Sequence, residues 1–353
     1  MKKPFLKINN EFFHNKNPLI IAEIGNNHQG SLQKCKDLFL AAKNSGANAV
    51  KLQKRTNKKI YTKKAFDEVY NSENSFAKTY GLHREYLEFG KSEYIELKKY
   101  AKKLNIIFFA TAFDIDSANF LNDNIDLPAF KIASADILNF PLIKHVATFN
   151  KPMILSTGFS DLKQIEKVYK ILTKKKVNFS FLQCTAAYPC KSEDLNLKVI
   201  KTFREKFKNI LIGFSSHHNG ISLEVVAYML GARIFEKHFT LNRSWKGTDH
   251  SFSLTPLGLS KMVRDIKRID TALGSNIKKP LDVEKKPILK MQKSLVASRD
   301  LKKGTVITLG DIDFKSPGGG IDPSRIKEIV GKKILNDLNF EEKFMIKYFK
   351  KVK

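Results

Sequence analysis

Eight short runs of β-branched and aromatic residues, separated by helical segments, constrain the fold of this chain more than any other feature of its sequence. The intervening segments Leu32–Ser45, Ser92–Leu104 and Leu162–Thr173 carry apolar residues at three- and four-residue spacing, which predicts amphipathic helices. Eight strands that alternate with helices are typical of a closed parallel (β/α)₈ TIM barrel, an α/β fold. The expected strands are Leu19–Ile24, Ala49–Gln53, Ile106–Thr111, Ala129–Ala133, Pro152–Ser156, Asn178–Gln183, Ile210–Phe214 and Arg233–Glu236.

An open, doubly wound sheet is the alternative for alternating strands and helices. Such a sheet normally carries a glycine-rich phosphate turn after its first strand. Here the first expected strand is followed by Gly25–Gly30, which reads GNNHQG and lacks a G-x-G-x-x-G pattern. The sequence therefore favours the barrel. The long polar connection from Lys54 to Lys91 is expected to be functional, as loops of that length in compact domains usually are.

The chain has 353 residues, which suits a barrel of roughly 250 residues followed by a small second domain. Beyond Gly274 short strands and tight turns replace the helical pattern. Asp300-Leu301 is loosely echoed by Asp337-Leu338, which indicates two related halves folded over each other. A domain this small is expected to dock onto something larger. We predict a catalytic barrel at 1–275, a linker at 276–290 and a small β-rich domain at 291–353.

Composition narrows the class of protein. The chain is 42% hydrophobic, enough for a large core, yet no apolar run approaches the roughly 20 residues of a membrane span. Its first residues are not followed by the apolar segment of a signal peptide, so we expect a cytoplasmic protein with no membrane partner. Cys35, Cys184 and Cys190 show no metal-ligand spacing and are expected to be packed thiols.

The net charge of +28 is the unusual global property of this sequence. A nucleic-acid-binding protein would gather basic residues and aromatics on one element, and would bind nucleic acid with a steep dependence on salt. Here lysines occur along the whole chain, which favours a solvated surface and no nucleic-acid partner. A positive field of this size would still attract anionic substrates.

Polar and titratable residues gather at the carboxyl ends of the expected strands, where barrel enzymes carry their catalytic groups. A single such residue is often only a cap or a packing residue, but agreement over eight strand ends predicts an active site. In chain order these candidates are Glu23, Lys51, Gln53, Thr111, Lys131, Ser134, Asp136, Ser156, Thr157, Tyr188, Ser215, His217, Glu236 and His238.

His217 and His238 follow adjacent strands, so their imidazoles can converge on one cation. Two histidines with nearby carboxylates and open water positions suit Mn²⁺, or Mg²⁺ where waters remain. Such an ion would polarise an aldehyde oxygen. We therefore predict that these two histidines are metal ligands.

Lys51 and Lys131 are expected to point into the barrel mouth, where an unpaired ammonium is costly to desolvate. An anionic ligand would relieve that cost. Hydroxyl groups nearby could add hydrogen bonds to its phosphate or carboxylate oxygens, namely those of Thr111, Ser134, Ser156 and Ser215. Schiff-base chemistry is the alternative role for such lysines. The sequence leaves both roles open.

Six segments in the expected order make the chain resemble the N-acetylneuraminate (sialic acid) synthase family, and 295–347 resembles the antifreeze-like (SAF) domain that follows the barrel there. The resemblance covers nearly the whole chain. The segments are Ile21–Gly30 (IAEIGNNHQG), Lys51–Gln53 (KLQ), Phe130–Ser134 (FKIAS), Ser156–Gly158 (STG), Cys184–Pro189 (CTAAYP) and Glu236–Leu241 (EKHFTL).

The resemblance implies roles for individual residues. His217 and His238 would hold Mn²⁺ or Mg²⁺. Phosphoenolpyruvate (PEP) would bind to residues matching Lys51, Thr111, Lys131, Ser134, Ser156 and Ser215. The sugar or the reacting atoms would contact residues matching Glu23, Gln53, Tyr188 and Asp249.

The family reaction implied by the resemblance is aldol-like. Carbon C3 of PEP attacks the metal-polarised aldehyde of open-chain N-acetylmannosamine, water adds at C2, and phosphate leaves by C–O cleavage. Members of the family are homodimers in which the SAF domain of one subunit covers the barrel mouth of the other. The same implications would make this chain a transferase of sialic acid biosynthesis that acts on PEP and an N-acylated amino sugar.

The sequence departs from the family pattern at two places, one expected to contact the N-acyl group of the sugar and one beside the expected metal ligands. Many bacterial members carry an Arg in the SAF domain that reaches the N-acyl group, whereas this chain has Lys315 and then Ser316 in the Arg position, and lysine lacks the guanidinium fork. Ser216 stands where many members have Asp or Gly, which is expected to alter the hydrogen bonds around the metal ligands.

The sugar itself has several candidates. Segments 78–83 and 245–251 look closer to the animal-type branch, which takes mannose derivatives phosphorylated at C6. Lys54-Arg55 would then meet that phosphate, or would simply be solvated. Precursors of legionaminic and pseudaminic acid are further alternatives, because the reacting centre would be shared.

Overall fold

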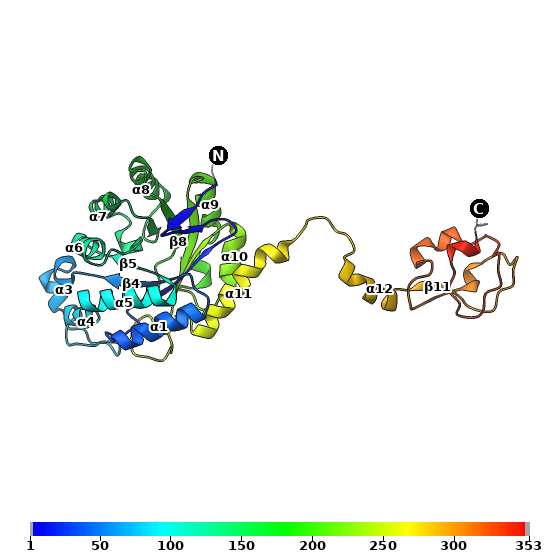
Figure 1. Cartoon of the computed structure of the whole chain (residues 1–353), viewed down its shortest axis with the longest axis horizontal. Coiled ribbons are helices and arrows are strands. Elements are labelled where there is room, and N and C mark those ends of the chain that lie inside the picture. Colours follow the sequence, from blue (N-terminus) through cyan, green and yellow to red (C-terminus); the bar gives the residue numbers. More distant parts are fainter. Residues whose placement is uncertain (1–2, 350–353) are drawn as a thin grey trace. The chain divides into compact units, whose positions relative to one another are not determined.

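The computed structural model describes residues 3–349 and divides the chain into two compact units, Met1–Gly274 and Ser275–Lys353 (Figure 1). Each unit has its own buried core and is described separately below. The contacts group the predicted linker with the second unit, so a separate linker at 276–290 stays a prediction.

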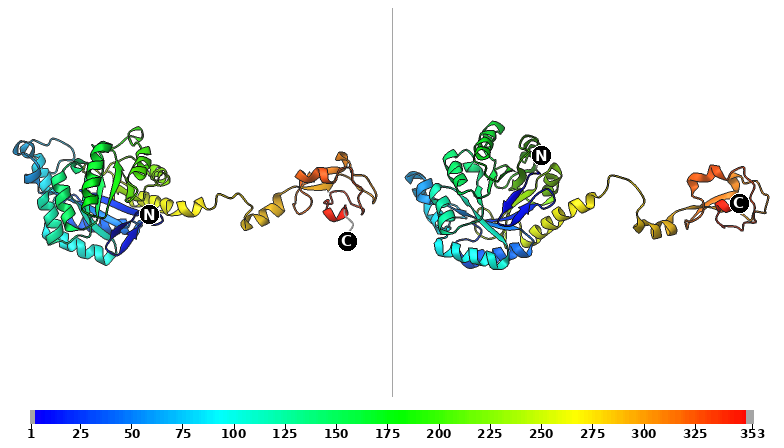
Figure 2. Two further views of the ribbon diagram at one scale, coloured as in Figure 1. Left: turned by 90° about the horizontal axis from the view of Figure 1, so that it is seen from above. Right: turned by 45° about the horizontal axis from the view of Figure 1, so that its top comes forward.

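The first unit is a closed barrel of eight parallel strands, which confirms the predicted fold (Figures 1 and 2). The order around the barrel follows the sequence, and β10 closes it by pairing with β3. The strands are β3 (Leu19–Gly25), β4 (Ala49–Lys54), β5 (Ile107–Ala112), β6 (Phe130–Ile132), β7 (Met153–Ser156), β8 (Phe179–Cys184), β9 (Leu211–Ser216) and β10 (Ile234–His238).

Helices alternate with the strands, as the periodicity predicts. In α8, Asp161 accepts a hydrogen bond from the Gln164 amide while Gln164 reaches back to the Asp161 amide, a capping box that starts the helix at Leu162. The α-helices of this unit are α1 (Leu32–Asn44), α2 (Asn57–Ile60), α3 (Lys63–Asp67), α4 (Tyr80–Tyr86), α5 (Lys91–Leu104), α6 (Ile115–Asn119), α7 (Phe140–Val146), α8 (Leu162–Lys174), α9 (Lys198–Lys206), α10 (Ser222–Leu230) and α11 (Pro256–Leu273).

Short 3₁₀ or π turns complete this unit, and they matter where they redirect the chain after a strand. They are η1 (Phe120–Asn124), η2 (Ser134–Asp136), η3 (Ala147–Phe149) and η4 (Ser192–Asp194).

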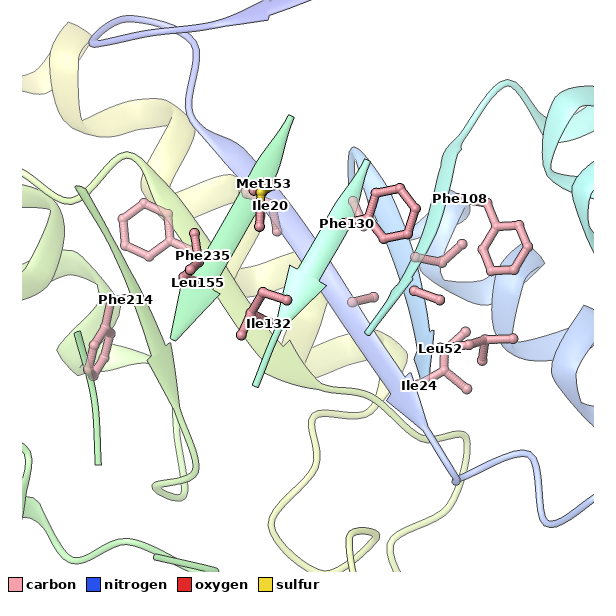
Figure 3. Packing of buried hydrophobic residues seen from close by; sticks show 14 of the residues in the cluster. Ile20, Ile24, Leu52, Phe108, Phe130, Ile132, Met153, Leu155, Phe214 and Phe235 are labelled. Carbon is pink, nitrogen blue, oxygen red and sulfur yellow. The ribbon is translucent and has the colours of Figure 1, made fainter. Parts of the chain in front are cut away.

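Two apolar layers hold the barrel together. The outward side chains of the strands pack against the helices, as Figure 3 shows for Ile20, Phe108 and Phe235. Inside the barrel, a second cluster fills the end where the strands begin. A hairpin of β1 (Leu6–Ile8) and β2 (Glu11–Phe13) contributes to that inner cluster through buried apolar side chains. The opposite end of the interior is therefore the one free to carry polar groups.

The second unit contains short strands and 3₁₀ turns, in keeping with the expected small β-rich domain. Strands β11 (Ser294–Ala297) and β12 (Ile312–Lys315) pair antiparallel. Leu301 and Leu338, from the two echoed segments, exchange backbone hydrogen bonds of 2.8 Å, so these segments do lie against each other. The remaining elements are α12 (Lys285–Met291), η5 (Asp282–Glu284), η6 (Leu309–Asp311), η7 (Pro323–Glu328) and η8 (Ile346–Tyr348).

Across residues 3–349 the structure has no helix that is both long and apolar enough to cross a bilayer.

Candidate active site

A cavity of about 380 Å³ opens where the barrel strands end. It is the place where the polar side chains of the inner face converge, because alternate residues of a strand point to the same side. Thirteen of the fifteen residues predicted for the site line it: Glu23, Lys51, Gln53, Thr111, Lys131, Ser134, Ser156, Tyr188, Ser215, His217, Glu236, His238 and Asp249.

Thr157 and Asp136 are the two exceptions, and the structure brings neither into this cavity. The chain turns into η2 directly after Ala133, so Ser134 faces the cavity while Asp136 lies in a neighbouring hollow beside Asp114 and Asn139. Its carboxylate accepts a hydrogen bond of 3.1 Å from the Asn139 side chain. Asp136 does not share the orientation of Ser134, because successive side chains of a 3₁₀ turn point in different directions.

Lys51 lies at the centre of a buried charge network. Its Nζ is 2.6 Å from Glu23 Oε2 and 3.6 Å from Glu236 Oε1, and it donates to Thr111 Oγ1 at 2.8 Å. The carboxylate of Glu23 also accepts from Gln53 at 2.7 Å. Two carboxylates near one ammonium offset the cost of burying its charge.

Lys131 is less well paired. Its Nζ donates to Ser156 Oγ at 2.7 Å and to the Ile132 carbonyl at 3.0 Å, and Glu236 Oε1 is 3.9 Å away. Burial lowers the pKa of Lys131, with Glu236 opposing the shift. Burial alone would raise the pKa of Glu236, but the charges of Lys131 and Lys51 hold it below its usual value. An anion beside Lys131 would relieve the cost of burying its charge.

Gly25, at the end of β3, has no side chain and so leaves space for the side chains of Glu23 and Gln53. Its φ of +54° lies in the left-handed region, and an added Cβ would approach Gln53 Nε2 to 3.1 Å and Glu23 Oε1 to 3.2 Å. A larger residue would strain the backbone and crowd both side chains.

His217 and His238 lie together in the same cavity, with ring centroids 5.3 Å apart, and His238 is the register partner of Glu23. The Nδ1 of His217 is 3.2 Å from the Thr185 carbonyl, which makes Nδ1 the protonated nitrogen and leaves Nε2 with a free lone pair. Burial, followed by the neighbouring His238, lowers the pKa of His217 to about 3. The Nδ1 of His238 is buried without a hydrogen-bond partner within residues 3–349, 3.7 Å from Asp249 Oδ2.

This donor set fits a hydrated divalent ion. His217 is in the neutral form that a metal requires, and a buried nitrogen of His238 lacks a partner. The described part of the chain forms no cluster of three or more His, Cys, Asp or Glu that could enclose an ion. A pair of imidazoles therefore suits an ion that keeps water or substrate in its other positions, as Mg²⁺ and Mn²⁺ do.

Several residues of the cavity wall were not predicted from the sequence, among them Arg84, which comes from α4 inside the long connection predicted to be functional. Arg55, which follows β4 and was expected to meet a sugar phosphate or to be solvated, also lies in the wall. The length of that connection indicated that the segment is functional, but it did not indicate that Arg84 in particular reaches the cavity. The other wall residues not predicted are Asn26, Phe113, Ala133, Ala135, Phe159, Cys184 and Thr248.

The two arginines are incompletely neutralised. Arg55 is buried, its guanidinium lies 3.8 Å from the centre of the Phe113 ring, and its Nη1 donates no hydrogen bond in the described residues. The nearest carboxylate to that Nη1 is Glu88 at 3.9 Å, which also pairs with Lys54 at 3.0 Å. Arg84 donates to the Tyr80 hydroxyl at 2.9 and 3.1 Å and forms no ion pair with any described residue.

The sequence of this chain matches known protein families and named relatives. Residues 38–278 match the NeuB family and residues 292–339 match the SAF domain. The N-acetylneuraminate-9-phosphate synthase of Homo sapiens is 39% identical over 327 residues, covering 92% of this chain and 91% of the relative. The N,N'-diacetyllegionaminic acid synthase of Campylobacter jejuni is 38% identical over 336 residues, covering 94% of this chain and 99% of the relative.

Solved structures agree. A crystal structure of N-acetylneuraminic acid synthetase from Leptospira borgpetersenii, in complex with citrate, superposes with a TM-score of 0.70 at 34% identity, covering 81% of this chain and 95% of that one. The match therefore extends to the fold as well as to the sequence.

Proposed function

The chain belongs to the NeuB family, a family of synthases, and from that premise we propose that it condenses PEP with open-chain N-acetylmannosamine to give N-acetylneuraminate and phosphate. The observation that carries the proposal is one cavity lined by a buried lysine pair, here called the lysine wall, and by two imidazoles, here called the metal wall. The lysines suit an anion, and the imidazoles would suit a divalent ion. The reaction needs both.

The lysine wall supports binding of PEP. Lys51 and Lys131 are both 2% exposed, and the hydroxyls of Thr111 and Ser156 already lie at hydrogen-bond distance from them. Ser134 and Ser215 line the same cavity and can donate to further phosphate or carboxylate oxygens. An anion held by fixed donors in a nearly dry site gains more than it would in water.

The metal wall would be formed by His217 and His238. A divalent ion bound there would act as a Lewis acid toward the aldehyde oxygen. Tyr188, whose ring centroid lies 4.0 Å from that of His217, and Asp249, next to His238, would orient the sugar on this side.

The reaction then follows from positions on the two walls. Carbon C3 of PEP bonds to the aldehyde carbon, and the aldehyde oxygen becomes a hydroxyl by taking a proton. When the C2–O bond to phosphate later breaks, the C2 hydroxyl becomes a carbonyl and its proton leaves with the phosphate. That hydroxyl comes from water, which adds at C2 and loses its other proton to a base. Glu23 and Glu236, held by Lys51, are the cavity carboxylates able to accept that proton, while Lys131 stabilises the leaving phosphate.

The direct test is phosphate release from PEP, measured with and without N-acetylmannosamine and with Mn²⁺, Mg²⁺ or a chelator. We expect release only with both sugar and metal, and a nine-carbon sugar acid by mass spectrometry. Release at the same rate without sugar would refute the proposal. Borohydride trapping separates the lysine roles, because a Schiff base would leave a stable adduct on Lys51 or Lys131 and an ionic contact would leave none.

Arg55 and Arg84 favour a second candidate, the same condensation with N-acetylmannosamine 6-phosphate to give the 9-phosphate. Two guanidinium groups in the cavity wall, one with a buried donor unused, exceed what a neutral sugar needs. Planar guanidinium forks match phosphate oxygens. The relative from Homo sapiens is named as a 9-phosphate synthase.

A panel of acceptors distinguishes the candidates. The acceptors would be N-acetylmannosamine, its 6-phosphate, and the N-acylated precursors of legionaminic and pseudaminic acid. The highest kcat/KM identifies the substrate. A preference for the free sugar would exclude the 9-phosphate candidate while leaving the condensation itself in place.

We also propose a homodimer in which the SAF domain of one subunit covers the barrel mouth of the other. Light scattering should then give twice the 40.3 kDa mass of one chain. A monomer at micromolar concentration would exclude this arrangement. Lys315, which pairs with Glu341 at 2.6 Å, is the residue we propose for contact with the N-acyl group in place of the missing Arg.

A further inference from the structure

Directly behind the two imidazoles, on the outer face of the barrel wall, lies a buried polar cluster that we name the strand clamp: Ser216, His218, Glu224 and Lys237. All four residues are at most 3% exposed. Ser216 ends β9 and Lys237 is its register partner on β10, while Glu224 reaches them from α10. None of these four side chains lines the active-site cavity.

Strand alternation explains why the clamp and the metal wall share a backbone. On β10, Glu236 and His238 face the cavity, so Lys237 between them points outward to the helices. On β9 and just after it, Ser215 and His217 face the cavity and Ser216 points outward. Ser216, His218 and Lys237 are therefore each one peptide away from a proposed metal ligand, and Glu224 reaches them from α10.

The contacts of the clamp run across the seam between the two strands. Lys237 Nζ is 3.4 Å from Glu224 Oε1, and it donates to Ser216 Oγ at 3.2 Å and to the carbonyl of His218 at 2.8 Å. Ser216 Oγ donates to Glu224 Oε1 at 2.9 Å. The carbonyl bond fixes the backbone directly after His217, and the lysine itself directly precedes His238.

A buried lysine at this position needs a reason, since an apolar residue would pack more cheaply between a barrel and its helices. The donors of Lys237 are used on three different groups, one on β9, one in the loop that follows it and one on α10. An apolar residue could fill the volume, but it could not hold a carbonyl in one direction.

We propose that Lys237, held by Glu224, is a positioning residue that sets the spacing and orientation of the His217 and His238 imidazoles. This rests on the proposed metal site. Groups that orient metal ligands typically change metal affinity by about 10–100-fold when removed.

The test uses Mn²⁺ alone as the probe, with binding measured on the full-length chain by electron paramagnetic resonance of the free ion and unfolding followed by circular dichroism. Lys237→Met should weaken Mn²⁺ binding by about tenfold or more and lower the unfolding temperature, because it leaves Glu224 buried without its cation. The double variant Lys237→Met with Glu224→Leu removes both charges. It should recover the unfolding temperature but not the affinity, because the bond to the His218 carbonyl is still missing.

The double variant decides between positioning and mere packing. If Mn²⁺ affinity recovers together with stability, the lysine only balances a charge and the inference is overturned. Absence of Mn²⁺ binding by the unaltered chain would overturn the metal site and this inference together. The matched control is the exposed pair on α9, Lys201→Met with Glu205→Leu, whose ions are 3.9 Å apart and about two-thirds exposed, and it should change neither measurement.

Discussion

The two ends of the barrel interior are made by the same strands and have opposite characters. Moving two residues along a strand keeps the same face but changes the chemistry from apolar to polar. The pairs are Ile21 and Glu23, Ala49 and Lys51, Phe109 and Thr111, Ala129 and Lys131, Ile154 and Ser156, Leu182 and Cys184, and Ile234 and Glu236.

One end of the barrel interior therefore contributes mainly to stability, and the other end carries the groups proposed for catalysis. The end where the strands begin is a packed apolar layer covered by the β1–β2 hairpin, and the end where they finish is a charged cavity. Burying charged groups lowers the free energy of unfolding, and burial of the apolar layer must offset this cost for the barrel to stay folded. Substitutions at the two ends should accordingly change different measurements.

The largest effect is expected at the polar end. His238→Ala should lower kcat/KM by roughly 10³-fold or more, about 4 kcal/mol, because it removes a proposed metal ligand. The unfolding temperature should change little, since His238 Nδ1 has no hydrogen bond to lose within residues 3–349. Steady-state phosphate release measures the first quantity, with the exposed His14→Ala as control. Normal activity in the variant would remove the metal assignment.

At the apolar end, Phe109→Ala should do the reverse. Its ring is fully buried, so truncation should lower the free energy of unfolding of the barrel by about 3–5 kcal/mol. Urea denaturation followed by circular dichroism measures this. The folded fraction should keep its kcat and KM. A large loss of kcat with unchanged stability would contradict the division between the two ends.

A smaller effect concerns pH. Burial lowers the pKa of His28 from 6.5 to about 3 in the folded chain. Below pH 6.5 the unfolded chain therefore binds a proton that the folded chain does not, so stability should fall as pH drops from 6.5 toward 3. By pH 5 this one group should cost about 2 kcal/mol.

Urea denaturation at pH 7 and pH 5 measures that loss. His28→Asn keeps an acceptor for the Gly30 amide, which now lies 3.1 Å from His28 Nδ1, but it cannot titrate. The variant should lose less stability on acidification than the unaltered chain. An equal loss in both would show that the acid sensitivity of the polar end arises elsewhere.

The smallest effect is expected at the rim of the polar end. Arg84→Ala should raise KM for the 6-phosphorylated sugar about tenfold, about 1.4 kcal/mol, and leave KM for PEP unchanged. Arg264→Ala, an exposed arginine of α11 that pairs with Asp265, is the control. A rise in KM for PEP instead would assign Arg84 to the PEP phosphate.

Much of the barrel could be predicted because its signals are local. Strand and helix periods are read within a few residues, and helix α5 (Lys91–Leu104) starts one residue before its predicted start at Ser92. The last strand extends to His238 rather than ending at Glu236, because its backbone pairing with β3 continues to Glu23. Pairing between strands distant in sequence is not visible in a local pattern.

Most of the predicted residues that line the cavity lie at or just after the end of a strand. Asp136 was expected there because it follows the fourth strand, but the turn η2 places it in a neighbouring hollow. Arg84 was missed because α4 reaches the cavity through the packing of a long connection, where Gly81 lies against the Phe66 ring. The Lys237 and Glu224 pair joins a strand to a helix, so no spacing rule indicates it.

The sequence by itself determined the eightfold alternation, the small second domain and the list of polar strand ends, because these follow from periods of two and 3.6 residues and from chain order. Only the tertiary structure decided which of those side chains meet. Closing the barrel brings β10 beside β3 and so unites groups as distant in sequence as Glu23 and His238. Contact, burial and charge pairing depend on that closure, and no local pattern contains it.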